Sequence, residues 1–284
     1  MDERASAFAP SDWTTLDAIC EWSALLEQRG GSRPVRVAFA PARHSSSAMA
    51  AAVLSPHFDD AVLSCWHVLQ GLGPVIVVNV FAGMPPERTT PGWWDRLTGA
   101  WDAAARVRER ASEDRAALAV AGRVPVNLDL LEAQHRRHTE SPAAIAGRIA
   151  AEVSGCDVVY APAALGAHPD HALVRDAALC LRTGGARVLL YADMPHAIAR
   201  GWPTWVASDG VVAVDVQWAD ALARSVIGPG VPRARVHLLG CLAQQRKLAA
   251  LRTYRTQIAA LEEMAFAPLA RSLRYEVAWD LPPA

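Results

Sequence analysis

Short apolar runs alternate with longer segments of helical character along most of the chain. Runs of this length, bounded by turn residues, are typical of strands buried on both faces of a parallel sheet. They cover residues 51–55, 74–81, 124–130, 157–161, 187–191 and 210–216. Segments of helical composition or periodicity cover residues 61–72, 101–121, 143–153, 170–182 and 236–261. The alternation predicts an α/β fold, a Rossmann-like three-layer sandwich around a mostly parallel sheet.

The first 48 residues are punctuated by Pro, Gly and Ser and differ in pattern from the rest of the chain. Apolar positions at helical spacing predict a helix over residues 13–28, and polar and apolar residues alternate over 35–40 as in a strand. We therefore expect an N-terminal extension over residues 1–48 that packs on the core, and one main domain over residues 49–284.

Charge and hydropathy exclude several classes of protein. The chain has 28 Lys and Arg against 29 Asp and Glu, so it lacks the basic field with which proteins neutralise phosphates. Its apolar runs are far shorter than the roughly 20 residues of a membrane span, and Asp2 and Glu3 stand where a secretory signal carries positive charge. We expect a cytoplasmic protein with a small-molecule substrate, without a nucleic acid partner or a membrane span. The oligomeric state is left open.

Five widely spaced cysteines contain no C-x-x-C pair and predict buried free thiols rather than a thiolate metal site. A metal would therefore be held by histidine and carboxylate. Two clusters of these residue types follow predicted strands, where ligands of parallel sheets sit. They are His57-Phe58-Asp59-Asp60 and His168-Pro169-Asp170-His171.

Two adjacent carboxylates beside a histidine at the end of a buried strand are costly unless a cation or hydrogen bonds compensate them. The alternative is that Asp59 and Asp60 cap the following helix. The second cluster, at an equivalent strand end, favours a metal. Two imidazoles, one carboxylate and an open position suit catalytic Zn²⁺, and Fe²⁺ accepts the same ligands. A remaining carboxylate to take a proton from water and a histidine to steady an oxyanion would complete a hydrolase.

The two motifs together resemble those of the PIG-L/LmbE-like family of zinc-dependent N-deacetylases, which includes N-acetylglucosaminyl deacetylases. Further similarity extends the resemblance to about residues 50–280. It lies in Arg110-x-x-Glu113 and in residues 128–136, 191–195, 247–257 and 276–279. The resemblance implies three zinc ligands, namely His57, Asp60 and His171. It also implies that Asp59 is the general base, that His168 stabilises the oxyanion, and that Asp170 orients the His168 imidazole.

Four residues are expected to face the substrate. Arg110 and Glu132 match positions that do so in the family, and Trp94 lies in a Pro-rich loop whose aromatic faces suit a sugar, although core packing is an equal alternative. His196 stands near the expected pocket where the family commonly has Tyr, with a surface or helix-start histidine as the alternative. Other departures are Phe58 for Pro, Trp66 for Gly and Glu132 for Asp. They leave the ligands intact and bear on substrate identity.

The predicted function is metal-dependent hydrolysis of an N-acyl group, most simply the acetyl group of an amino sugar or amino-sugar conjugate. One alternative is an amidase that cleaves a larger amide in a thiol-sugar conjugate or a secondary metabolite. Another is a non-catalytic metal-binding or nucleotide-binding module, because fold does not fix function. Such a module would not require both Asp59 and His168. A dinucleotide-binding module would also be expected to carry a G-x-G-x-x-G motif after the first strand, which this sequence lacks.

Overall fold

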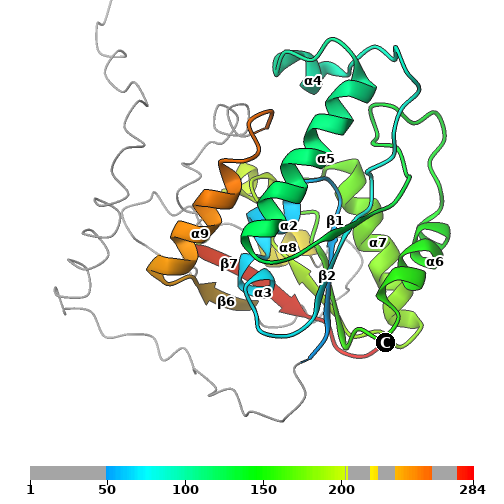
Figure 1. The fold of residues 1–284 in the computed structure, drawn as a ribbon. Coiled ribbons are helices and arrows are strands. Elements are labelled where there is room, and N and C mark those ends of the chain that lie inside the picture. Colours follow the sequence, from blue (N-terminus) through cyan, green and yellow to red (C-terminus); the bar gives the residue numbers. More distant parts are fainter. Residues whose placement is uncertain (1–48, 202, 204–217, 223–233, 258–273) are drawn as a thin grey trace, which may run out of the picture. The chain divides into compact units, whose positions relative to one another are not determined.

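A computed structural model describes residues 49–201, 203, 218–222, 234–257 and 274–284. Within them, a seven-stranded sheet has the order β3-β2-β1-β4-β5-β7-β6 (Figure 1). Its strands are β1 (Ala51–Ser55), β2 (Val75–Asn79), β3 (Pro125–Asn127), β4 (Val158–Pro162), β5 (Val188–Tyr191), β6 (Ala234–Leu238) and β7 (Tyr275–Asp280). The first five strands are parallel, and β7 runs antiparallel to both β5 and β6. The predicted mostly parallel α/β sheet is confirmed.

Helices cover both faces of this sheet (Figure 1). On one face lie α2 (Asp60–Ser64), α3 (Trp66–Leu69), α5 (Ala103–Val120) and α9 (Cys241–Leu251), which pack on one another. On the other face, α6 (Pro142–Val153) packs against α7 (Pro169–Thr183). Right-handed crossovers explain this division, because the chain reverses its direction of progress across the sheet between β3 and β4. Shorter elements are α4 (Trp93–Leu97), the 3₁₀ helix η1 (His196–Arg200) and α8 (Trp218–Leu222).

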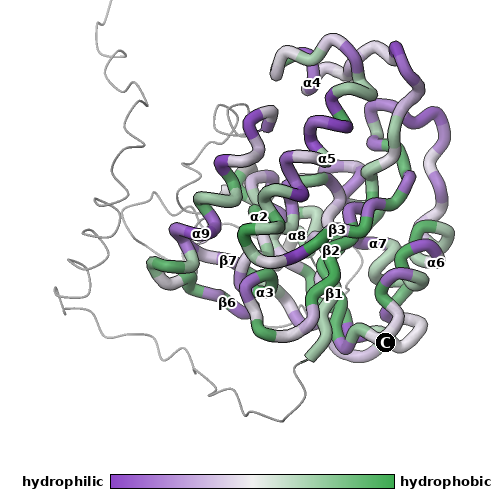
Figure 2. Tube along the Cα trace, viewed as in Figure 1, coloured by the Kyte–Doolittle hydropathy of each residue, from purple (hydrophilic) through white to green (hydrophobic). Residues whose placement is uncertain are grey.

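The central strand β1 is buried along its whole length, and the apolar character of β1 and β2 is visible in Figure 2. Ala52, Val53 and Leu54 are fully buried, as expected for a strand covered by helices on both sides. The pairing of β1 with β2 and with β4 brings the carboxyl ends of these strands to one edge. The two histidine motifs follow β1 and β4, so this edge carries the candidate site.

Two predicted helices differ from the structure. The helix expected over residues 61–72 is interrupted at Cys65, because the backbone N–H groups of Trp66 and His67 donate to the carboxylate of Glu276, at 2.8 and 2.7 Å. The helix expected over 236–261 was wrong at its start, because residues 234–238 pair with β7 as a strand. Gly240 then precedes α9, which ends at Leu251.

The interruption at Cys65 belongs to a buried ionic centre that ties the C-terminal strand to the helices. The Glu276 carboxylate also accepts a hydrogen bond from the ammonium group of Lys247 at 2.7 Å, and both side chains are fully buried. Burial would raise the pKa of Glu276, but Lys247 and His67 outweigh it and lower the pKa to about 2. Removing one member of such a pair typically costs about 3–5 kcal/mol of stability.

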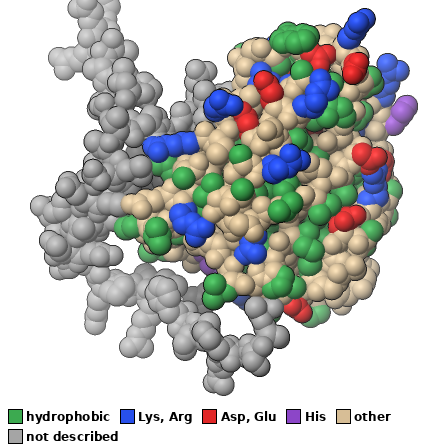
Figure 3. Space-filling view, viewed as in Figure 1, with side chains coloured by type: hydrophobic (Ala, Val, Ile, Leu, Met, Phe, Trp, Pro, Cys, Tyr) green, Lys and Arg blue, Asp and Glu red, His purple; other side chains and the backbone are tan. Residues whose placement is uncertain are grey.

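Several expectations lie outside the described residues, namely the extension over 1–48 with its helix and strand, and the strand over 210–216. Cys65, Cys156, Cys180 and Cys241 are free thiols, and Cys65 is buried as expected, whereas Cys180 and Cys241 are exposed. On the face shown in Figure 3, acidic and basic side chains are interspersed. No helix in the described part of the chain combines the length and apolar character needed to cross a membrane.

Candidate metal and catalytic site

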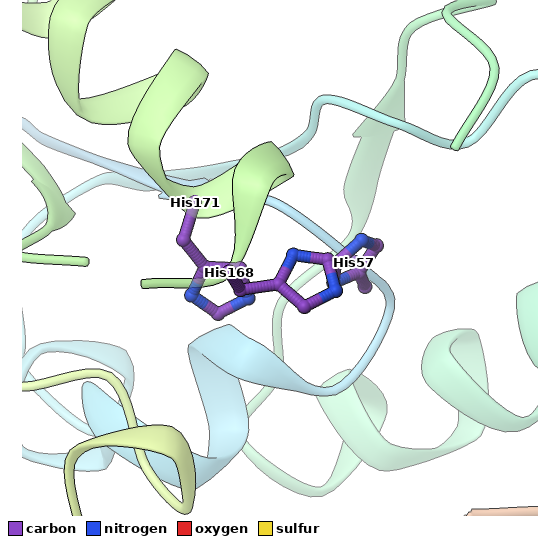
Figure 4. Close-up of side chains that lie close together, drawn as sticks. All are labelled: His57, His168 and His171. Carbon is purple, nitrogen blue, oxygen red and sulfur yellow. The ribbon is translucent and has the colours of Figure 1, made fainter. Parts of the chain in front are cut away.

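The imidazoles of His57, His168 and His171 lie together at the carboxyl edge of the sheet (Figure 4). His57 lies in the turn between β1 and α2, His168 is the N-cap residue of α7, and His171 lies in the first turn of that helix. The His57 ring centroid lies 5.0 Å from that of His168 and 5.3 Å from that of His171. Two motifs separated by more than 100 residues thus form one cluster.

The carboxylate of Asp60 lies between two of these rings. Its Oδ2 is 3.5 Å from His57 Nδ1 and 3.4 Å from His171 Nε2. In a tetrahedral zinc site, with bonds of about 2.0 to 2.1 Å, two ligand atoms lie roughly 3.3 Å apart. His171 Nε2 is buried without a hydrogen-bond partner, as a nitrogen reserved for a metal would be. The donor set His57, Asp60 and His171 therefore fits a metal ion.

A second donor set overlaps the first. One nitrogen from each of His57, His168 and His171 lies within 4.8 Å of the others. In this set His168 replaces Asp60, which leaves a carboxylate free instead of an imidazole. The two sets differ in charge and in the residue that remains available for catalysis, so variants of Asp60 and His168 distinguish them.

His171 is oriented by a carboxylate that sequence analysis missed. Its Nδ1 lies 3.0 Å from Oδ2 of Asp193, which is fully buried. The other oxygen of Asp193 accepts a hydrogen bond from the backbone N–H of Leu165 at 3.0 Å. A carboxylate on one ring nitrogen fixes the tautomer and leaves the opposite nitrogen as a ligand. The available signal was the position of Asp193 two residues after β5, at the carboxyl end of a third strand.

The turn that carries Asp60 is held by hydrogen bonds within its own segment. Asp60 Oδ2 accepts from the backbone N–H of His57 at 2.8 Å, and the Ser55 hydroxyl donates to the His57 carbonyl and accepts from Ala61 N–H. Burial would raise the pKa of Asp60, but His171 and His57 outweigh it and hold the pKa well below its usual range. Asp60 is therefore an ionised carboxylate, the form that binds metals.

Asp59 has a different environment from its neighbour Asp60. It is the N-cap residue of α2, yet its side chain makes no capping hydrogen bond, contrary to the capping alternative. Burial, followed by repulsion from Asp60, raises the pKa of Asp59 to about 6. A carboxylate with a pKa near neutrality is suited to exchange a proton with water.

Asp170 connects both motifs to a third loop. Its Oδ2 lies 3.0 Å from His57 Nε2 and accepts from Ala133 N–H, and its Oδ1 lies 2.5 Å from the guanidinium of Arg136. Its contact with His168 is made by the backbone, since Asp170 N–H donates to His168 Nδ1 at 3.2 Å. The carboxylate expected to orient His168 thus contacts His57. Arg136, to which the sequence analysis gave no role, contacts the site through this pair.

Arg110 and Glu132, two of the predicted substrate-facing residues, are buried and paired with each other. Arg110 forms ion pairs with Asp95 at 2.5 Å and with Glu132 at 3.3 Å. Gln134 donates to both carboxylates, at 3.0 Å to Asp95 and 2.6 Å to Glu132. This network leaves Arg110 compensated by two acidic groups. Its guanidinium is consequently a poor candidate for binding an additional anion.

The other two predicted substrate-facing residues, Trp94 and His196, differ in their distance from the histidine cluster, since only His196 lies within it. Trp94 is half-buried and donates from Nε1 to Gln257 at 2.9 Å, whereas Trp93 is 59% exposed. His196 lies in the histidine cluster, with its ring centroid 4.7 Å from His171 and 5.2 Å from His168. A Cβ at Gly166 would lie 2.5 Å from that of His196, so glycine permits this close approach.

The fold and these side chains define an α/β protein with a candidate hydrolytic metal centre. Residues 52–181 match the model of the PIG-L family, described as GlcNAc-PI de-N-acetylase. This confirms the resemblance and supports an enzyme that hydrolyses N-acetyl groups of amino sugars. A comparison with curated proteins finds no match by sequence.

Several solved structures with the same fold are deacetylases. One is the A40926 pseudoaglycone deacetylase Dbv21, with 26% identity, a TM-score of 0.63, and coverage of 82% of this chain and 97% of that one. Another is a triple mutant of the deacetylase of the teicoplanin biosynthetic pathway, with 25% identity, a TM-score of 0.65, and coverage of 84% and 99%. A zinc-inhibited form of teicoplanin deacetylase Orf2 has 22% identity, a TM-score of 0.65, and coverage of 83% and 99%, and shows the fold alone.

Proposed function

We propose that this protein is a metal-dependent hydrolase that removes an N-acetyl group from an amino sugar or amino-sugar conjugate, releasing acetate and a free amine. The observation that carries the proposal is the position of Asp60 Oδ2 between nitrogens of His57 and His171, at distances close to those in a tetrahedral site. The buried, unpartnered Nε2 of His171 supports it. The match of residues 52–181 to the PIG-L family model supports the choice of the amide bond.

His57, Asp60 and His171 would hold the metal, which we propose to be Zn²⁺, with Fe²⁺ as the other ion that accepts these ligands. Such an ion, when bound, acts as a Lewis acid towards a carbonyl oxygen and lowers the pKa of water. Asp193 keeps the His171 tautomer that presents Nε2, and Asp170 orients His57 from the opposite side of its ring. Both carboxylates would therefore act on the metal through its ligands.

Asp59 is the general base in this proposal. The oxygen of a water molecule attacks the acyl carbon while Asp59 takes one of its protons. The C–N bond then breaks, and Asp59 returns the proton to the leaving nitrogen, which departs as an amine. The pKa of about 6, raised by burial and by Asp60, allows Asp59 to accept and to release a proton near neutral pH.

His168 would stabilise the oxyanion that forms as water adds to the carbonyl. Its Nδ1 accepts from Asp170 N–H, so the proton of the neutral ring resides on Nε2. Burial and the neighbouring His57 and His171 lower the pKa of His168 to about 3, which keeps the ring neutral. A neutral donor gains most from the interaction when negative charge develops in the transition state.

The substrate side of the site favours a neutral, hydroxyl-rich ligand. Arg110 is already compensated by Asp95 and Glu132, so this group adds no free positive charge that would select an anionic ligand. Glu132, Trp94 and His196 would border the ligand. The A40926 pseudoaglycone deacetylase, 26% identical to this chain, makes glycopeptide conjugates a reasonable part of any substrate panel.

The test measures amine and acetate release from N-acetylglucosamine, its glycosides and N-acetylated glycopeptides. Metal-loaded protein should release both products in equal amounts, chelated protein should release neither, and re-addition of zinc should restore the reaction. An unchanged rate after complete metal removal would contradict metal dependence. A panel with longer acyl groups distinguishes the amidase alternative, which requires faster cleavage of the larger amides.

A further inference from the structure

A chain of buried polar groups lies behind the turn that carries Asp59 and is not used in the mechanism above. The Tyr254 hydroxyl, shortly after α9, lies 2.7 Å from Oδ1 of Asp114 on α5 and 2.9 Å from the backbone carbonyl oxygen of Phe58. The second oxygen of Asp114 accepts a hydrogen bond from the Asn79 amide at 2.7 Å. Phe58, Asp114 and Tyr254 are at most 2% exposed.

The Tyr254 hydroxyl has a single hydrogen, and this constrains the protonation state of Asp114. A phenol has one hydrogen to donate, and both of its close neighbours here are oxygen atoms. The Phe58 carbonyl can only accept. An ionised Asp114 could also only accept. The single hydrogen of Tyr254 could then reach either the Phe58 carbonyl oxygen or Asp114 Oδ1, and the other buried oxygen would be left without a hydrogen bond to the hydroxyl, which is unfavourable.

A proton on Asp114 resolves this conflict. Asp114 Oδ1 then donates to the Tyr254 oxygen, and the Tyr254 hydroxyl donates to the Phe58 carbonyl. We propose that Asp114 is a neutral carboxylic acid in the active protein and, with Tyr254, is a positioning residue for the turn that carries Asp59. The catalytic part of this inference rests on the proposed function, whereas the protonation state does not.

Two consequences connect the pair to the site. The Phe58 carbonyl belongs to the peptide unit that leads into Asp59, so its hydrogen bond fixes the backbone from which the general base projects. A neutral Asp114 also avoids a third negative charge behind Asp59 and Asp60. Ionisation of Asp114 would remove the bond to Phe58 and add that charge, and both effects would impair Asp59.

The surroundings of Asp114 agree with this state. Burial raises the pKa of Asp114 to about 7, against the hydrogen bonds of Tyr254 and Asn79, and the charge of Asp59 acts in the same direction as burial. Arg115 is the cation that lowers the pKa. Burial and Asp114 also raise the pKa of the Tyr254 phenol, so Tyr254 keeps its proton when Asp114 ionises.

Asp114→Asn is the decisive variant, because its amide reproduces the neutral acid. The amide nitrogen can donate to Tyr254 and the amide oxygen can accept from Asn79. At pH 6 the infrared carbonyl band of protonated carboxylic acids should be stronger in the wild type than in Asp114→Asn. The difference between the two spectra isolates Asp114, because Asp59, with a pKa of about 6, contributes to the band in both proteins. Asp280→Asn, which alters a half-buried carboxylate paired with Arg187 and Arg235, should show the same band as the wild type.

Thermal stability gives a second measurement without substrate. The folded protein holds a proton on Asp114 more strongly than the unfolded chain, whose pKa is about 4. The wild type should therefore lose stability relative to Asp114→Asn as pH rises from 4 to 7, since the unfolded state binds fewer protons over that range. Asp114→Asn should fold and keep kcat within about threefold at pH 6. It should retain more of its kcat than the wild type above pH 7.

Tyr254→Phe removes the bridge while conserving the ring. We expect kcat to fall about tenfold, with KM and metal content little changed, as for the loss of one buried hydrogen bond. Equal infrared bands in the wild type and Asp114→Asn, a parallel pH dependence of the melting temperature in both proteins, or failure of Asp114→Asn to fold would overturn the protonation state. A normal band with normal kcat in Tyr254→Phe would overturn the positioning role. An inactive wild type with a normal band would contradict only the proposed function.

Discussion

The two histidine motifs meet in one site, but they are held in place differently. The turn at residues 57–60 is closed chiefly by its own segment, through Ser55, the His57 backbone N–H and the Asp60 carboxylate. One long-range hydrogen bond, from Tyr254 to the Phe58 carbonyl, adds to these. The start of α7 is oriented by groups far away in the sequence. Asp193 lies 3.0 Å from His171 Nδ1, and Arg136 lies 2.5 Å from Asp170.

The ligands of the first motif are thus positioned mainly by neighbouring residues in the sequence, and those of the second motif by residues of other segments. A turn that satisfies its own polar groups can present a carboxylate ligand as soon as β1 and α2 form. The histidine of α7 presents Nε2 only after β5 places Asp193 beside it. We therefore expect changes at Asp193 and Arg136 to weaken the metal site without removing a ligand, and changes within the turn to act on the ligands directly.

The largest effects are expected within the turn itself, where two adjacent carboxylates have different environments. Asp60→Ala should lose most bound metal and activity together, because it removes an ionised ligand between His57 and His171. Asp59→Asn should keep its metal and lose about 10²- to 10⁴-fold in kcat, the usual cost of a missing general base. Metal analysis and kcat for both variants provide the test.

Two outcomes would revise this assignment. Metal loss in Asp59→Asn with retention in Asp60→Ala would reverse the roles of the carboxylates. Full metal content in Asp60→Ala, together with metal loss in His168→Ala, would instead favour the donor set His57, His168 and His171.

Asp193→Asn tests the long-range support of the second motif. The amide keeps the volume and can still accept from Leu165 N–H, but it removes the negative charge beside His171 Nδ1. We expect metal affinity to fall about 10- to 100-fold, as for other partners of ligating histidines. Asp176→Asn on the same helix α7, where Asp176 pairs with Arg175, is the matched control and should bind metal as the wild type does. Equal affinity in both variants would contradict a supporting role for Asp193.

Sequence patterns predicted the elements whose structure is determined by neighbouring residues in the chain. The continuous apolar runs identified β1 and β4, and the position of the histidine motifs after them predicted that these residues meet. The interruption at Cys65 was not predictable from propensity, because it depends on Glu276, more than 200 residues away. Residues 236–238 were included in a predicted helix because their sequence does not distinguish a helix from a strand. Their pairing with β7 makes them part of strand β6.

Within the site, the missing information was again long-range. His57, Asp60 and His171 stand in the two histidine motifs. Asp193 and Arg136 stand in segments that share the family resemblance but imply no role for either residue. Charged residues in a turn are usually solvated, so Arg136 gave no signal until the fold brought Asp170 beside it. Partners of this kind become visible only when distances between segments are known.

The smallest effect is expected at Arg136, which acts two contacts away from the metal. Its guanidinium pairs with Asp170, lies 4.7 Å from the centre of the Phe81 ring, and donates to the Leu131 carbonyl. In Arg136→Ala, Asp170 would still contact His57 and accept from Ala133 N–H. We expect metal affinity to fall by less than about tenfold, with a comparable fall in kcat.

Arg136→Lys and Arg137→Ala make this prediction specific. Lysine keeps the positive charge near Asp170 but cannot form the planar contacts of the guanidinium, so it should recover part of the affinity. Arg137 is exposed and adjacent in sequence, and its replacement should leave metal binding unchanged. If Arg136→Ala lowered affinity as strongly as Asp193→Asn, support through Asp170 would be as important as direct support of His171. If all three variants bound metal equally, the Arg136–Asp170 pair would stabilise the loop and not the metal site.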